Sequence, residues 1–313
     1  MEKIVVMGTG TMAAGIGAGF IQAGMQVVFL GRSLDKAEQA ASEAGRLANA
    51  LVGKALEGPL GGHLPALAGL TDFWNDWRDT ALVIETIVED LELKRQLFAS
   101  LDSRVPPGVP IGSNSSSFPI TRIAQGLAGR GRMFNTHYFM PAHLVPLVEV
   151  ALGEASDPAI AEAVCALYRR IGKRPVLVRK DIPGFLANRI QHALMREALS
   201  LIDRGIATAE DVDAAVRYSF GFRYAAAGPI LQKEISGWDV TSQAAAEIYP
   251  WLSNTKSVPA CLASLVADGK TGMKSGEGFM SWPPELARQE KLAYDKRLKA
   301  AFDLLTLDEP AAK

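Results

Sequence analysis

Two side chains near the middle of the chain, His137 and Glu149, could move a proton together. A neutral imidazole is the side chain best suited to removing a hydroxyl proton near neutral pH. A carboxylate on the other ring nitrogen would fix the tautomer and stabilise the imidazolium that forms. A single histidine near a strand end is more often structural, so this pair alone predicts a candidate base and no particular reaction.

Side chains that could bind a ligand by hydrogen bonds occur in one short run, Asn114-Ser115-Ser116-Ser117. The run follows a short apolar strand predicted at Val109–Ser113. The carboxyl ends of parallel strands are where α/β sheets place ligand groups. The same residues could instead cap the helix that starts near Pro119, and the sequence leaves both interpretations open.

These side chains need a scaffold, and the first thirty residues predict one. Lys3–Met7 is an apolar, β-branched run that leads directly into the glycine-rich segment Gly8–Gly17. Gln26–Leu30 is a second apolar run, and the residues between have helical character. The order of strand, glycine turn, helix and strand indicates the first βαβ unit of a dinucleotide-binding domain.

The residue types in the glycine turn suit a bound pyrophosphate. Gly8 permits a tight turn, Gly10 lets the backbone approach the phosphates, and Ala13 lets the helix pack closely on the strand. The free N–H groups at the helix start, around Thr11 and Met12, would face the phosphates. We therefore predict that this turn binds a cofactor, although glycine turns also occur for steric reasons alone.

The residues after the second strand predict which dinucleotide is bound. An acidic residue there accepts a hydrogen bond from the 2′-hydroxyl of NAD, whereas a nearby Arg suits the 2′-phosphate of NADP. Here Gly31 takes the acidic position, and Arg32, Ser33 and Lys36 follow it. They predict NADP, with NAD as the alternative, unless Arg32 is simply a solvated loop residue.

The pattern of strands and helices changes near residue 180. Before it we predict a doubly wound, mostly parallel α/β sheet; after it we predict only helices. The domains are thus 1–180, for the dinucleotide, and 181–313, for the substrate cleft and dimerisation. Gly58–Leu70 is predicted as a loop after a helix that ends near Ala55. The later strands are predicted at Ala81–Ile87, Val109–Ser113, Met133–Phe139, Leu147–Val150 and Pro175–Val178. The later helices are predicted at Arg189–Arg204, Thr208–Ser219, Trp238–Leu252 and Glu285–Leu305.

Composition excludes several classes of partner. The 313 residues are 48% apolar and 21% charged, with a net charge of −1, so neither nucleic acid nor an anionic membrane is expected to bind. The two cysteines have no CxxC spacing and predict neither a zinc site nor a disulfide framework. We find no transmembrane stretch and no signal peptide, and therefore expect a cytoplasmic protein.

Seven stretches, which together span nearly the whole chain, carry a family resemblance. They are Gly8–Gly17, Val83–Asp90 with Lys94, Ser113–Ser117, His137–Pro141, Leu147–Val150, Asp181–Arg189 and Lys274–Phe279. In this order they resemble the 3-hydroxyacyl-CoA dehydrogenases. The resemblance implies a Rossmann-type domain followed by an all-helical one. It also implies reversible hydride transfer between NAD(P) and the 3-hydroxyl of an L-3-hydroxy acid or its thioester.

The resemblance further implies roles for single residues. His137 would be the general base and Glu149 its partner, while Ser116 and Asn188 would hydrogen-bond the hydroxyl or carbonyl oxygen of the substrate. The residues that would lie along the cofactor, besides the glycine turn, are Glu89, Lys94 and Asn114. Met140 stands where the family usually has Asn, so one hydrogen bond near the base is expected to be absent.

Two segments, Val145–Glu149 and Gly221–Pro229, look more like one branch of the family, the lambda-crystallin, L-gulonate and L-carnitine dehydrogenases. That branch acts on small free hydroxy acids. Arg223 would then pair with the substrate carboxylate through a bidentate fork. It could equally be a surface charge.

Three other interpretations stay open. One is a 3-hydroxyacyl-CoA (3-hydroxybutyryl-CoA) dehydrogenase proper, and another is a β-hydroxyacid dehydrogenase with a catalytic lysine. The third is a crystallin-like structural protein that binds a dinucleotide without catalysis. The last two conflict with the full set of candidate catalytic residues. Apolar helix surface in the carboxyl-terminal segment also predicts a homodimer, through residues such as Leu194, Leu199, Leu201, Ile202, Ile248, Trp251 and Leu252.

Overall fold

A computed structural model describes residues 2–51 and 66–305 of the chain. The backbone divides into two compact units, Met1–Arg189 and Ile190–Lys313. The first unit contains every strand among the described residues, and the second is helical. The predicted fold class, a mostly parallel doubly wound sheet followed by a helical domain, is therefore confirmed. The predicted domain boundary near residue 180 stays a prediction.

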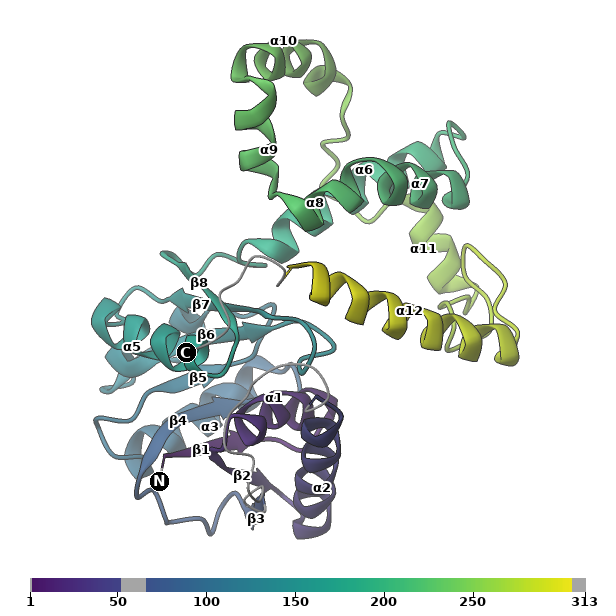
Figure 1. The fold of residues 1–313 in the computed structure, drawn as a ribbon. Coiled ribbons are helices and arrows are strands. Elements are labelled where there is room, and N and C mark those ends of the chain that lie inside the picture. Colours follow the sequence, from purple (N-terminus) through teal and green to yellow (C-terminus); the bar gives the residue numbers. More distant parts are fainter. Residues whose placement is uncertain (1, 52–65, 306–313) are drawn as a thin grey trace. The chain divides into compact units, whose positions relative to one another are not determined.

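The first unit is organised around one sheet of eight strands (Figure 1). Their order is β3-β2-β1-β4-β5-β6-β7-β8, and every neighbouring pair is parallel except β6 and β7. The strands are β1 (Lys3–Met7), β2 (Gln26–Gly31), β3 (Leu67–Leu70), β4 (Thr80–Glu85), β5 (Ile111–Ser113), β6 (Met133–Tyr138), β7 (Leu147–Leu152) and β8 (Arg174–Val178). The chain order reverses beside β1, so the carboxyl end of this strand lies at the topological switch point, where such sheets bind ligands.

The loop predicted at Gly58–Leu70 is wrong at its carboxyl end. Leu67–Leu70 forms β3 and pairs in parallel with β2. None of these four residues has a β-branched side chain, so the sequence carries almost no local signal for a strand here. The extended conformation of the segment therefore depends on its pairing with β2. The rest of that predicted loop, and the predicted helix end near Ala55, lie outside the described residues.

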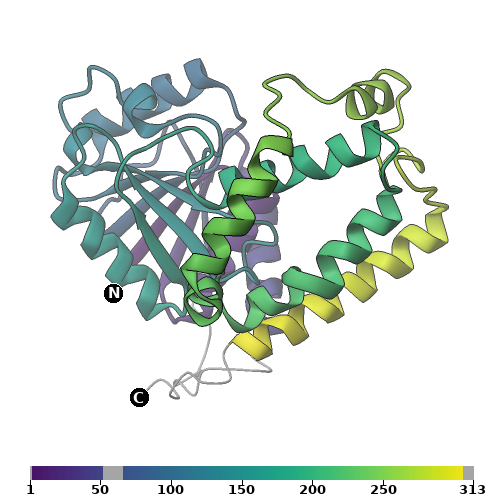
Figure 2. The same ribbon diagram turned by 90° about the horizontal axis from the view of Figure 1, so that it is seen from above.

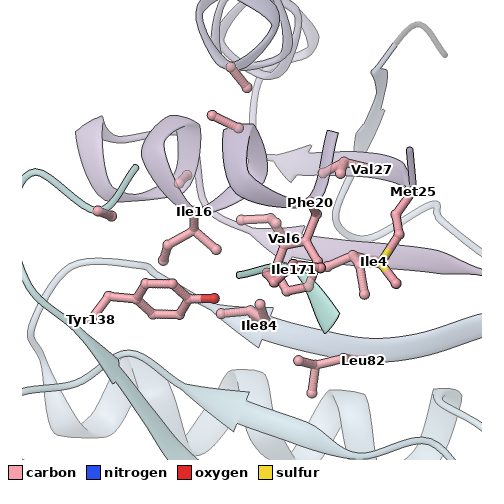
Figure 3. Packing of buried hydrophobic residues seen from close by; sticks show 14 of the residues in the cluster. Ile4, Val6, Ile16, Phe20, Met25, Val27, Leu82, Ile84, Tyr138 and Ile171 are labelled. Carbon is pink, nitrogen blue, oxygen red and sulfur yellow. The ribbon is translucent and has the colours of Figure 1, made fainter. Parts of the chain in front are cut away.

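Helices cover both faces of the sheet, as Figure 2 shows from above. One face carries α1 (Thr11–Gln22), α2 (Leu34–Leu51) and α5 (Pro158–Arg170), and the other carries α3 (Leu91–Arg104) and α4 (Ile120–Ile123). Each face has its own hydrophobic core. Because side chains alternate along each strand, Ile4 and Val6 of β1 pack in the core under α1, α2 and α5, whereas Val5 and Met7 pack in the core under α3 and α4. Figure 3 shows Phe20 of α1 beside Ile4 and Val6.

The second unit consists of helices joined by loops, the longest of which connects α11 to α12. They are α6 (Ala187–Asp203, which begins in the first unit), α7 (Ala209–Val216), α8 (Phe222–Ala226), α9 (Pro229–Ser236), α10 (Trp238–Ile248), α11 (Ala260–Ala267) and α12 (Pro284–Leu305). Within the unit α12 packs against α8, and α9 packs against α10. No helix among the described residues is both long and apolar enough to cross a bilayer.

Candidate active site

The glycine turn after β1 leaves room for a ligand at the start of α1. Gly8 is required by the fold, because its φ is 129° and an added Cβ would lie 2.4 Å from Oγ1 of Thr86. Gly10 is different, since a Cβ there would meet no atom of the described residues within 4 Å. No side chain caps α1 at Gly10, so its first N–H groups, with the exposed Thr11 and half-buried Met12, suit a phosphate.

The end of β2 carries a buried glycine and is followed by exposed charged residues, Arg32, Asp35 and Lys36. An added Cβ at the buried Gly31 would lie 2.8 Å from Cγ2 of Thr9, so an acidic residue fits only if Thr9 moves. Arg32 and Lys36 are exposed and Ser33 is half-buried at the start of α2. The NADP preference predicted from these residues stays a prediction.

The candidate base lies at the end of β6. His137 pairs in register with Glu149, because β6 and β7 run antiparallel. Both side chains are buried, and Nδ1 of His137 lies 2.9 Å from Oε2 of Glu149. Nε2 makes no hydrogen bond with the described residues. An ionised Glu149 therefore places the proton on Nδ1 and leaves the lone pair on Nε2, as a general base requires.

The second oxygen of Glu149 fixes this carboxylate to the start of α6. Oε1 accepts hydrogen bonds from the backbone N–H groups of Leu186, at 2.9 Å, and Ala187, at 2.8 Å. Burial raises the pKa of Glu149, but the bonds from His137, Ala187 and Leu186 outweigh it, and the net pKa lies below the ordinary value. Glu149 is thus ionised at neutral pH and holds the required tautomer of His137.

Two aromatic rings flank the imidazole, and sequence reasoning assigned no role to either. The rings of Phe139 and Phe185 lie 4.6 and 5.5 Å from that of His137. Phe185 is buried and has a φ of 45°, in the left-handed region, which costs a non-glycine residue about 1–3 kcal/mol. This conformation directly precedes the two N–H groups that bind Glu149. The only signal for it in the sequence is the preceding Pro183-Gly184 pair.

The serine run does not cap α4, so that alternative is wrong. The first N–H groups of α4, those of Ile120 and Thr121, donate at 2.7 Å to Oδ1 of Asn135 and to Oδ2 of Asp181. Asn114, predicted beside the cofactor, accepts at Oδ1 from the N–H of Tyr138 at 2.9 Å. That bond ties the serine run to the residue that follows the base. The half-buried hydroxyl of Ser116 makes no hydrogen bond with the described residues.

Lys94 is buried inside the protein. Its side chain is 1% exposed, and Nζ lies 2.6 Å from Oε1 of Glu85, 3.3 Å from the carbonyl oxygen of Ile87 and 3.3 Å from Oε2 of Glu89. The ammonium group therefore fixes two carboxylates at the end of β4. The predicted place of Lys94 and Glu89 along the cofactor stays a prediction. Sequence reasoning gave no role to Glu85, whose only signal is a carboxylate inside an apolar strand.

Most of the predicted catalytic residues lie at one edge of the sheet. Asn188 follows Ala187 in the first turn of α6, next to the contacts of Glu149. The serine run follows β5, and β5 runs parallel to β6, which carries His137. Arg223 belongs to the second unit, where it lies exposed in α8. Among the described residues no group of three or more His, Cys, Asp or Glu side chains could hold a metal ion.

The sequence matches family models over most of its length. Residues 3–182 match the 3-hydroxyacyl-CoA dehydrogenase NAD binding domain, and residues 184–282 match the C-terminal domain of the same family. The chain belongs to the 3-hydroxyacyl-CoA dehydrogenase family. This dehydrogenase is therefore an oxidoreductase that binds a nicotinamide dinucleotide. The resemblance inferred from the seven stretches is confirmed, and neither the catalytic-lysine nor the non-catalytic alternative is supported.

Relatives place this dehydrogenase within the family. It is 31% identical over 97% of its length, and 98% of the relative's, to 5-formyl-3-hydroxy-2-methylpyridine 4-carboxylate 5-dehydrogenase of Mesorhizobium japonicum. It is 34% identical to L-carnitine dehydrogenase of Streptomyces griseus over 76% of this chain and 70% of that one. A crystal structure of a 5-formyl-3-hydroxy-2-methylpyridine 4-carboxylic acid 5-dehydrogenase, described as an NAD+-dependent dismutase, superposes with a TM-score of 0.89. In that comparison the identity is 29%, and 99% of this chain and all of the other are covered. The predicted likeness to the carnitine dehydrogenase branch is thus confirmed.

Proposed function

We propose that this dehydrogenase oxidises the 3-hydroxyl of a small free L-3-hydroxy acid, reversibly, with His137 as the base. The supporting observation is the protonation state that the site imposes on that imidazole. Glu149 holds Nδ1 at 2.9 Å, and Nε2 stays open to a substrate. Ser116 and Asn188 lie at the same edge of the sheet and would bind the oxygen that reacts.

Each of the proposed catalytic residues has a separate role in the reaction. Nε2 of His137 takes the hydroxyl proton as the hydrogen on C3 leaves with its electron pair, and the C–O bond becomes a carbonyl. A bound nicotinamide ring supplies the acceptor for that hydride. Glu149 stabilises the imidazolium, which then loses its proton to solvent. Ser116 and Asn188 donate hydrogen bonds to the substrate oxygen and orient the carbinol carbon.

The identity of the substrate is tested by an initial-rate screen of short 3-hydroxy acids against their CoA thioesters, with each cofactor. The likeness to L-carnitine dehydrogenase supports the free acids.

Arg223→Ala should raise KM for the acid about ten- to a hundredfold, the scale of one lost charged hydrogen bond of about 1.5–3 kcal/mol. The methyl ester of the same acid, which lacks the carboxylate, is the control and should show no such change. Turnover of acetoacetyl-CoA without any turnover of free acids would restore the 3-hydroxyacyl-CoA dehydrogenase alternative.

A second candidate substrate is a hydrated aromatic aldehyde. The full-length likeness to the pyridine aldehyde dehydrogenase favours it. The same base can serve, because a hydrated aldehyde carries a hydroxyl on the carbon that loses hydride, and the product is a carboxylic acid. Including aromatic aldehydes in the screen distinguishes the two candidate substrates. If the hydrated aldehyde is the substrate, the enzyme should oxidise aromatic aldehydes to acids and should not turn over 3-hydroxy acids.

We propose further that the preferred cofactor is NADP. Support comes from the residues after β2, where the close contact with Thr9 disfavours an acid at Gly31, and where Arg32 and Lys36 are exposed. The matching family model and the solved relative are both described with NAD. The proposal therefore depends on the ribose-binding residues of this chain alone.

Wild-type enzyme should favour NADP about ten- to a hundredfold in kcat/KM, the scale of a charged hydrogen bond to the 2′-phosphate. Arg32→Gln should remove most of this preference. Arg46→Gln, in α2 and bound to Glu43, is the charge-matched control and should not change it. Adding Gly31→Asp with Thr9→Ser, which removes the obstructing methyl group, should turn the preference toward NAD. A wild-type ratio in favour of NAD, measured at one ionic strength, would end this proposal.

We also propose that two copies of the chain form a dimer through the second unit. Among its described residues only Leu199 and Ala287 are buried hydrophobics. Large apolar side chains elsewhere in the unit, Trp251 at 77% and Ile235 at 76% among them, are exposed. Monomeric proteins rarely leave so much apolar surface in water, and a second copy is the simplest cover. We expect this dimer in the cytoplasm, where the free thiol of Cys165 would stay reduced.

Light scattering after size exclusion should give twice the mass of one chain at micromolar concentration. Trp251→Glu would place a charge on the exposed apolar surface, and we expect it to weaken the assembly. Glu92→Gln in the first unit is the control and should leave the mass unchanged. A monomer at all concentrations would refute the dimer without affecting the assignment of the base.

A further inference from the structure

Ser116 stands between two residues that are held by one carboxylate oxygen. Oε1 of Glu89 accepts a hydrogen bond from Oγ of Ser115 at 2.6 Å and another from the N–H of Ser117 at 2.9 Å. Oγ of Ser115 also accepts from the N–H of Phe118 at 2.9 Å, which closes the turn. The backbone on both sides of Ser116 is therefore fixed, while its own hydroxyl stays available.

Glu89 is itself held in place from the core. Its other oxygen, Oε2, lies 3.3 Å from Nζ of Lys94, which donates at 2.6 Å to Oε1 of Glu85. Oε2 of Glu85 accepts from Oγ of Ser113 at 2.6 Å. A continuous chain of charged hydrogen bonds thus runs from the end of β5 through β4 and α3 and returns to the serine run. Bonds of this kind are short and directional, so they transmit position well.

The net pKa of Glu89 agrees with this arrangement. Burial raises it, but the bonds from Ser115, Ser117 and Lys94 outweigh that effect, and the pKa lies below the ordinary value. The group is an anion at neutral pH and accepts from its neighbours without a proton of its own to donate. A neutral acid could not keep both acceptor contacts and the ion pair.

We propose that Glu89 is a positioning residue that sets the place of the Ser116 hydroxyl for the substrate oxygen. The proposal rests on the substrate contact proposed above for Ser116. A hydroxyl that must meet an oxygen at hydrogen-bond distance loses most of its effect when its backbone shifts by about 1 Å. Removing the carboxylate frees the N–H of Ser117 and the hydroxyl of Ser115, while the N–H of Ser115 stays bound to Oγ of Ser113. The backbone that carries Ser116 then lacks a fixed support on its carboxyl side, and the proposed effect of Glu89 on the reaction passes through that residue.

The test is a double-mutant cycle of Glu89→Ala and Ser116→Ala, read as kcat/KM for the substrate at saturating cofactor. With Ser116 present, Glu89→Ala should lower kcat/KM about ten- to a hundredfold. With Ser116 already replaced, the same change should cost no more than about twofold. Glu89→Gln keeps an oxygen for Ser115 and Ser117, so it should retain more activity than Glu89→Ala wherever Ser116 is intact.

Controls separate positioning from other roles. Glu92→Gln removes an exposed charge from the first turn of α3 and should leave kcat/KM unchanged. The dissociation constant of the reduced cofactor, measured by fluorescence, shows any direct effect of Glu89 on cofactor binding. If Glu89→Ala does not fold, as judged by its thermal midpoint, the cycle is completed with Glu89→Gln.

Equal losses in the presence and absence of Ser116 would overturn the proposal, because Glu89 would then act independently of that hydroxyl. An unchanged kcat/KM in Ser116→Ala alone would overturn it too, since no substrate contact would exist to position. Neither result would touch the proposed reaction or His137 as its base, which the replacement of His137 tests, although the second result would remove the substrate contact proposed for Ser116. Loss of activity in His137 variants together with an additive cycle would therefore leave the base assigned and Glu89 without this role.

Discussion

Replacing His137 with glutamine should lower kcat by about two to four powers of ten, the usual contribution of a well-placed acid–base group. The affinity for the cofactor should stay nearly unchanged. Glutamine can keep a hydrogen bond to the carboxylate of Glu149, so the carboxylate is not left alone in the core. What the variant lacks is a basic nitrogen in the place of Nε2. The loss should therefore appear in kcat at saturating substrate, measured in both reaction directions.

The matched control is His192→Gln, which removes an exposed imidazole from α6 and should retain wild-type turnover. The far-ultraviolet circular dichroism of both variants should match that of the wild type, since the side-chain hydrogen bond of His137 goes to another side chain, that of Glu149, and not to the main chain. A His137 variant that keeps more than about a tenth of wild-type turnover, far outside the usual loss, would show that another group takes the proton.

The Rossmann-type half of the molecule could be predicted because its signals are local. The run Lys3–Met7 coincides with β1, and Gly8 and Gly10 occupy the turn that their types predict. Each feature depends on residues that are adjacent in sequence, where a buried strand or a turn leaves a clear mark. Leu67–Leu70 shows the opposite case, since its strand exists only through pairing with β2.

The site could be predicted in its residues but not in its geometry. The eleven residues between His137 and Glu149 are compatible with many arrangements, and only the antiparallel register of β6 and β7 places the two side chains opposite each other. The left-handed Phe185 and its two neighbouring N–H donors complete the carboxylate's contacts from a loop 37 residues further along the chain. Contacts over such separations leave no periodicity in the sequence.

The burial of Lys94 could not be predicted from the sequence either. A lysine in an amphipathic helix predicts a solvated charge, and the family resemblance assigns it to the cofactor. The structure buries it against Glu85, which lies inside an apolar strand. A buried ion pair of this kind is costly to desolvate, and here it fixes the two side chains to each other at 2.6 Å. Lys94 also contacts Glu89, and Glu89 in turn holds the serine run through Ser115 and Ser117.

Replacing Glu149 with glutamine should lower kcat about a hundredfold or more, within the range of acid–base groups, although the shape of the side chain hardly changes. The backbone N–H groups of Leu186 and Ala187 can only donate, so they require an oxygen at the place of Oε1. The glutamine amide must therefore turn its NH2 group toward His137. Nδ1 then has to accept, the ring proton moves to Nε2, and the lone pair that would take the substrate proton is lost.

This mechanism differs from simple loss of a charge in what alkaline pH can restore. If Glu149 only stabilised the imidazolium, activity in the glutamine variant would recover as rising pH favoured loss of the substrate proton. A wrong tautomer is a neutral species, so raising the pH leaves it unchanged and the deficit should persist across the pH profile. The exposed Glu154, just after β7, supplies the matched control Glu154→Gln, which should behave as wild type. A glutamine variant of Glu149 that regains wild-type kcat at high pH would exclude the tautomer as the cause and leave only electrostatic stabilisation.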